Sequence, residues 1–165
     1  MATWADLRRD RPELAAAGER LLGANGEGIA FLATVRGDGG PRLHPVMPIL
    51  AASRLHLFVV DLSPKYADLQ RDGRFALHAL PPAHGGEEFY VTGRAEIVED
   101  AARRAMVTTA SGGRLGRHEF EALFALDLRH VLHTVWENWG TAGAWPDYRK
   151  WPEHAPSPPP PAAPV

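Results

Sequence analysis

The sequence contains no cysteine, and this absence removes several kinds of chemistry from consideration. Disulfide bonds, thiolate metal sites and a cysteine nucleophile are excluded, and the composition suits a reducing compartment. Long apolar runs are missing as well: the first residues, MATWADLRRDRPELAAAGERLL, carry charges throughout and lack the apolar run of a signal peptide. No later segment is long enough to span a bilayer. We therefore expect a cytoplasmic protein with no membrane partner.

Charge of one sign is not concentrated anywhere along the chain. The 18 Lys and Arg residues stand against 20 Asp and Glu residues, and the basic residues are scattered rather than gathered into a stripe. Nucleic-acid binding usually depends on such a stripe, so we expect no nucleic-acid partner. With 165 residues, of which 45% are hydrophobic, the chain is long enough for one domain with a core and too short for two of ordinary size.

Hydrophobic alternation and turn signals predict six strands. The glycine-rich turn RGDGGP joins the first two as a hairpin, and strict alternation in the fifth indicates a sheet with one buried face. The sixth is so long that we expect a bend or a bulge in its middle. The predicted strands cover residues 29–35, 42–50, 55–60, 75–80, 89–98 and 120–136.

Short helices are expected at three places. In the first segment Thr3 or Asp10 can cap a helix, and Pro12 suits a first turn. A second helix follows Ser63, and a third begins near residues 99–100. Six strands with short connections and only short helices favour a mainly β (α+β) fold, in which an antiparallel sheet closes into a barrel.

The end of the chain differs in kind from the rest. Six of the 15 prolines fall in the last segment, APSPPPPAAPV, which cannot form a core. We therefore expect one domain over residues 1–154 and a disordered, proline-rich tail over residues 155–165.

Ser63 and Lys65 occupy the start of a helix directly after a buried strand, within LHLFVVDLSPKYADLQRDGRFALH. Ser63 suits an N-cap and Pro64 suits the first helical position, so one interpretation is a capped helix with a solvated lysine. The same geometry also suits a phosphate, because a helix N-terminus offers free amides and partial positive charge beside the hydroxyl and the ammonium. These residues alone leave both interpretations open.

Three motifs taken in order, ATVRGDGGPRLHPV, SPKYADLQRDGRFALH and VTGRAEIVED, resemble the flavin-binding split-barrel proteins related to pyridoxamine 5'-phosphate oxidase. The resemblance covers about residues 27–110. It implies a six-stranded antiparallel split β-barrel with short flanking helices. It also implies a homodimer that holds FMN at the subunit interface, with the deazaflavin F420 or haem as alternatives.

The same resemblance implies a set of cofactor-binding residues. The phosphate-binding residues that it implies are Ser63 and Lys65, and Pro64 stands where the family often has an arginine. The other implied positions, on the second and third strands, are Arg42, His44, Pro45, Val46, Met47, Val59 and Val60. No catalytic residue is assigned. The family's Arg-Leu-x-Pro ending is missing, so we expect an FMN- or F420-dependent oxidoreductase that is not a true pyridoxamine phosphate oxidase.

Other kinds of site find less support in the sequence. His130 and His133 stand three apart, which on a strand sends them to opposite faces, so we expect no metal site there. No GxSxG motif marks a hydrolase nucleophile. A non-catalytic protein that sequesters a flavin, F420 or haem is the alternative function. Four of the five tryptophans fall in residues 136–151, where they pack the end of the barrel, form a dimer contact or close over the cofactor.

Overall fold

The structure is a computed structural model that describes residues 2–23 and 28–152. The predicted tail at 155–165 lies outside the described residues. The helices are α1 (Trp4–Asp10), α2 (Pro12–Gly23), α3 (Pro64–Arg71) and α4 (Ala101–Ala110). The strands are β1 (Ala30–Val35), β2 (Pro41–Val46), β3 (Ile49–Ala51), β4 (Arg54–Val60), β5 (Arg74–Ala79), β6 (Glu87–Ile97), β7 (Glu121–Glu137) and β8 (Trp145–Trp151).

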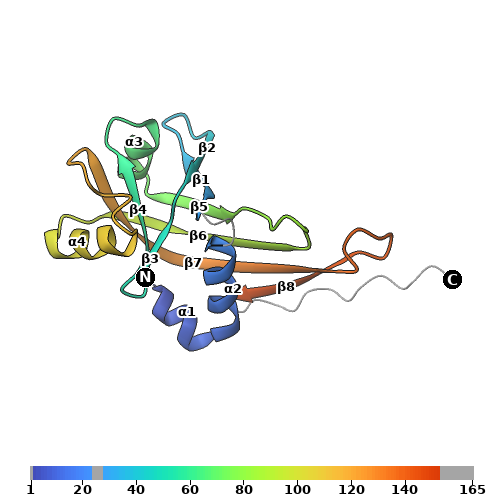
Figure 1. The fold of residues 1–165 in the computed structure, drawn as a ribbon. Helices are drawn as coiled ribbons and strands as arrows, with labels where there is room; N and C mark the ends of the chain where they lie inside the picture. Colours follow the sequence, from blue (N-terminus) through green and yellow to red (C-terminus); the bar gives the residue numbers. More distant parts are fainter. Residues whose placement is uncertain (1, 24–27, 153–165) are drawn as a thin grey trace.

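The strands form one curled antiparallel sheet (Figure 1), which confirms the predicted mainly β fold. Its order is β2-β1-β5-β6-β7-β4-β3, and β8 pairs with the second half of β7. The β7–β8 hairpin extends away from the rest of the molecule, while α3 lies above and the α1–α2 pair below the long central strands in the view of Figure 1. Within the described residues, no helix is both long and apolar enough to cross a bilayer.

The described residues form eight strands rather than the predicted six. The single strand predicted over residues 42–50 is interrupted at Met47 and Pro48, where proline has no amide hydrogen to give to a ladder, so it becomes β2 and β3. The tryptophan-rich segment supplies the other additional strand, β8, which was not predicted. Its pairing with β7 puts Trp151 opposite Val131, where its side chain reaches the core.

The predicted irregularity in the sixth strand is present as a bulge. The register between β6 and β7 changes between Thr92 and Gly93, so that Thr92 faces His130 and Gly93 faces Leu128. One residue of β7, Arg129, is therefore extra. The strands approach so closely here that a Cβ atom on Gly93 would lie 1.7 Å from the carbonyl oxygen of Asp127.

The first segment folds as two helices. Thr3 caps α1 in a capping box with Asp6, and Pro12 begins α2, as their sequence positions suggest. The buried side chains of α1 and α2 pack in one core with those of α3 and with those on one face of the sheet, which is called the inner face. That core includes Trp4, Leu14, Leu57, Leu69, Leu77, Phe89 and Phe124.

The other sheet face, called the outer face below, is covered only in part. Val107 of α4 packs on Ile49 and Leu123 at the end of the sheet formed by β3, β4 and β7. At the β2–β1–β5–β6 end the outer face carries a cross-strand row of four side chains, Pro45, Phe31, His78 and Tyr90, and Leu43 lies two residues from Pro45 on the same face of β2. Leu43 is 64% exposed and Phe31 37% exposed, so the described helices leave this end of the outer face open.

Candidate functional site

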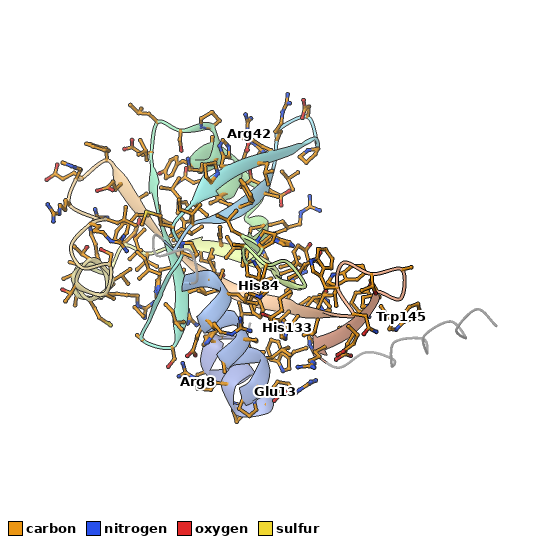
Figure 2. The ribbon with its side chains drawn as sticks, turned by 45° about the vertical axis from the view of Figure 1, so that its right-hand side comes forward. Arg8, Glu13, Arg42, His84, His133 and Trp145 are labelled. Carbon is orange, nitrogen blue, oxygen red and sulfur yellow. The ribbon has the colours of Figure 1, made fainter. Side chains whose placement is uncertain are left out.

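Arg42 joins the sheet to the helix that follows the Ser-Pro-Lys motif. On β2, Arg42 pairs with Thr34 and His44 pairs with Leu32, so both side chains lie on the inner face beside α3. The Nε atom of Arg42 donates to Oδ2 of Asp68, on α3, over 2.8 Å. Figure 2 shows Arg42 at the end of the molecule that carries α3, well apart from His133 and from Trp145 on the β7–β8 hairpin.

Arg42 and His44 on β2 and Lys65 and Asp68 on α3 form the corner of the molecule that is the candidate site, and Asp68 is buried at its centre. Its side chain is 3% exposed, and Thr34 Oγ1 donates to Oδ2 over 2.9 Å while Arg71 donates to Oδ1 over 3.3 Å. Burial raises the pKa of the Asp68 carboxyl, but the hydrogen bonds from Arg42, Thr34 and Arg71 outweigh it, so the pKa lies below its ordinary value. Asp68 is therefore an anion near neutral pH, and it holds β1, β2 and α3 together.

Lys65 and His44 complete the corner. Lys65 stands three residues before Asp68 on α3, on the same side of the helix, and is half-buried. Burial first, and then the charges of Lys65 and Arg42, lower the pKa of His44, so its imidazole is neutral near pH 7. Two groups are left for a ligand: within the described residues Lys65 has no carboxylate partner, and the buried Nε2 atom of His44 has no hydrogen-bond partner.

Ser63 occupies the N-cap position of α3 without capping it through its side chain. Its hydroxyl donates to the carbonyl oxygen of Val60 over 2.6 Å, and the side chain accepts no cap hydrogen bond. Ser63 is therefore the N-cap residue of α3, as expected, but its side chain does not accept the hydrogen bond that a capping serine usually accepts. To donate to a phosphate, the hydroxyl would have to leave Val60.

The remaining predicted positions do not gather in one place. Val46 and Val59 are buried in the core, whereas Pro45 and Val60 are exposed, because successive residues of a strand point to opposite faces. Met47 lies in the break between β2 and β3 and lines a cavity of about 150 Å³ with Ser111 and Arg114 beside α4. The structure thus brings Arg42, His44 and Lys65 together around Asp68 and sets the others apart.

A second cavity, of about 320 Å³, opens on the other side of the β1–β2 hairpin. It lies on the outer face, where Val35 and Pro41 meet Tyr90 and Thr92. Its lining is mainly apolar, which suits the flat ring of a cofactor better than a phosphate. Among the described residues no cluster of three metal-ligating side chains occurs.

Asp68 and Thr34 were missed by sequence reasoning. Asp68 stands three residues after Lys65, a spacing that would place both on one side of a helix, but the pattern gives no sign that a carboxylate there is buried. Thr34 was seen only as part of a strand. Their role depends on how α3 packs on the β1–β2 hairpin, which is a tertiary contact.

The curled antiparallel sheet with short helices at its ends defines a split β-barrel protein. The sequence matches the family model described as pyridoxamine 5'-phosphate oxidase over residues 21–141, which is well over half of the chain. The chain therefore belongs to the pyridoxamine 5'-phosphate oxidase-like split-barrel family, as its motifs suggested. Among curated proteins, none matches this sequence.

Several solved structures share the fold. A haem-binding protein from Mycobacterium smegmatis superposes with a TM-score of 0.60 at 22% identity, covering 81% of this chain and 57% of its own length. The haem storage protein HutZ from Vibrio cholerae gives 0.58 at 15% identity, covering 72% and 89%. A structure described as an F420 reductase gives 0.50 at 20% identity, covering 61% and 86%. This chain thus spans less than two thirds of the mycobacterial protein, and these identities establish the fold alone.

Proposed function

We propose that the protein is a flavin- or deazaflavin-dependent oxidoreductase whose cofactor binds with its phosphate at the corner of Arg42, His44 and Lys65. The single observation that carries the proposal is the pair of unused polar groups there, Lys65 Nζ and His44 Nε2, beside the start of α3 in a chain of this family. A cation, a ring nitrogen and helix amides are suitable partners for a phosphate.

The cofactor, when bound, supplies hydride transfer, and the protein binds and orients it. Lys65 would neutralise the phosphate, Arg42 would donate hydrogen bonds to it while its charge stays paired with Asp68, and the neutral imidazole of His44 can donate one more. Hydride transfer by the cofactor needs none of the described residues as an acid or a base. The small organic substrate would approach the ring, away from these residues.

A homodimer is part of the same proposal. The open end of the outer face presents Leu43 and Phe31, exposed to 64% and 37%, next to the 320 Å³ cavity lined by Tyr90. A second copy of the chain would bury these side chains and close the cavity. Because β2 is the edge strand of the sheet, a cofactor held at the corner would pass round that edge to place its ring between subunits.

Non-catalytic binding of haem is the second candidate. The observation that favours it is the neutral His44 with its unpaired Nε2, because an axial haem ligand needs an imidazole nitrogen in that state. Two of the structures that share the fold are described as a haem-binding and a haem storage protein.

Absorption spectroscopy of the purified protein, followed by separate titrations with FMN, F420 and haem, tests both candidates. Saturable binding of FMN or F420, with turnover when a reductant and acceptors are added, supports the oxidoreductase. A Soret band that disappears in the variant His44→Ala supports haem binding instead. Failure to bind any of the three contradicts both.

A further inference from the structure

We propose that Asp68 determines which kind of phosphate the corner accepts, and that the wild-type site favours a singly charged phosphodiester over a doubly charged phosphomonoester. The inference rests on the proposed function, since it concerns the same corner. It names Asp68 as a specificity-determining residue that acts through Arg42 and does not touch the cofactor itself.

The ion pair between Arg42 and Asp68 carries the argument. Arg42 Nε lies 2.8 Å from Asp68 Oδ2, and the Arg42 side chain is 31% exposed while that of Asp68 is 3% exposed. Because the bond to Asp68 is made through Nε, it leaves the edge formed by the two terminal nitrogens of the guanidinium free to donate to an anion in a bidentate way. The carboxylate therefore holds the guanidinium in place and, as its ion-pair partner, offsets its positive charge.

Arg71 does not restore that charge to the corner. It also contacts Asp68, over 3.3 Å, but it belongs to the last turn of α3 and donates to the carbonyl of Val35. Its side chain is 45% exposed, so water screens its charge, and it stands six positions after Lys65 on α3. His44 adds no charge near pH 7. Among the residues that the structure describes at the start of α3, Lys65 is the one cation without a carboxylate partner.

One cation balances one negative charge. A phosphate linked to carbon on both sides carries a single charge over the whole working range of pH, whereas a terminal phosphate loses a second proton with a pKa near 6. At pH 7.5 the second charge of a monoester would face Asp68 across Arg42 with no cation of its own. The corner thus matches the charge of a diester.

FMN and its methyl phosphodiester test this directly, because the two share the ring and the ribityl chain and differ in one ionisable oxygen. Dissociation constants are measured from quenching of flavin fluorescence. The wild-type protein should bind the methyl ester at least as tightly as FMN at pH 7.5. In Asp68→Asn, where the corner gains one net positive charge, the ratio of affinities should move toward FMN by about tenfold.

The pH dependence separates a charge effect from a structural one. At pH 5.5 FMN loses most of its second charge, so the difference between wild type and Asp68→Asn in that ratio should shrink. Arg42 and Thr34 from the sheet and Arg71 from α3 donate to Asp68, and the other charged or titratable groups of the corner are Lys65 on α3 and His44 on β2. Protonation of His44 at low pH acts nearly alike on the two probes, because both are then mainly singly charged.

Asp72→Asn is the matched control, since Asp72 also pairs with an arginine, Arg74, but at the opposite end of α3. It should leave the ratio at the wild-type value. A wild-type preference for FMN over the methyl ester at pH 7.5 overturns the inference without any variant, and so does an unchanged ratio in folded Asp68→Asn. If neither probe binds to the wild-type protein, the proposed function is what fails.

Discussion

His133 on β7 lies with its Nε2 atom 3.0 Å from Oε1 of Glu87 on β6. Arg20 of α2 donates to both oxygens of the same carboxylate, over 2.9 and 2.6 Å. The bond from Arg20 is the largest influence on the pKa of Glu87, and with that from His133 it outweighs burial, so the pKa lies below its ordinary value. Glu87 thus joins α2 to the two central strands.

The variant Glu87→Gln should be less stable than wild type at pH 7 by about 1 kcal/mol, because it loses the charged partner of Arg20 while keeping its shape. A carboxyl with a lowered folded-state pKa contributes stability above its unfolded pKa and loses it as the pH falls through the folded value. The destabilisation should therefore shrink below about pH 4. Urea unfolding at both pH values measures it. Glu119→Gln, at an exposed position, is the control, and a difference that grows in acid would contradict the assignment.

Removing the ammonium of Lys65 should weaken cofactor binding while leaving the fold intact. Lys65→Ala loses one charge-assisted contact to phosphate, worth about 1.5–3 kcal/mol, so the dissociation constant should rise roughly 10- to 100-fold. Titration with FMN or F420 measures the constant, and thermal unfolding of the free protein checks stability. Arg36→Ala, which removes an exposed cation paired locally with Asp38, should change neither. Equal affinities in wild type and Lys65→Ala would refute the phosphate assignment.

A charge on the open end of the outer face should separate the proposed subunits. Leu43→Arg places a cation on the open outer face near Phe31, so the sedimentation coefficient should fall from that of a dimer to that of a monomer. Leu62→Arg is the control, since Leu62 is 91% exposed but lies in the loop before α3. A protein that sediments as a monomer before any change, or a dimer that tolerates Leu43→Arg, would show that this face is not the interface.

The bulge between β6 and β7 should not accept a side chain. In Gly93→Ala the new methyl group would lie 1.7 Å from the Asp127 carbonyl oxygen, a backbone atom that cannot move alone. We expect a loss of more than about 3 kcal/mol in unfolding free energy. Gly23→Ala, where a Cβ meets nothing within 4 Å, should cost far less. Denaturant unfolding of both variants decides, and near-equal losses would mean that the strands can separate here at little cost.

Local patterns predicted most of the fold. Alternation located the strands, Asp100 caps α4 as its position suggested, and the excessive length of β7 indicated its bulge. The break at Pro48 and the strand β8 were not predicted, since a pattern of aromatic and turn residues fits a packed loop as well as a hairpin. The segment forms the strand β8 because it pairs with β7, and such pairing is a long-range contact that a local pattern does not show.

The candidate site was less accessible from the sequence than the fold. Motif order singled out Arg42, His44 and Lys65, and the structure brings these together. It could not show that Asp68 would be buried, nor that the Ser63 hydroxyl would donate to Val60. Both depend on the position in which α3 packs against the sheet, and the spacing of residues in the sequence does not predict that position.

The long strand β7 pairs with β6 along one edge and with β4 and then β8 along the other. During synthesis, every element from α1 to α4 leaves the ribosome before this strand does. Until β7 emerges, no strand connects β4 to β6. The part of the sheet that contains β3 and β4 and the part that contains β5 and β6 therefore stay separate. Folding of the barrel is therefore a late event, governed by contacts between distant parts of the chain, and a ribosome stalled before residue 121 would display an open sheet whose unpaired edges invite a chaperone.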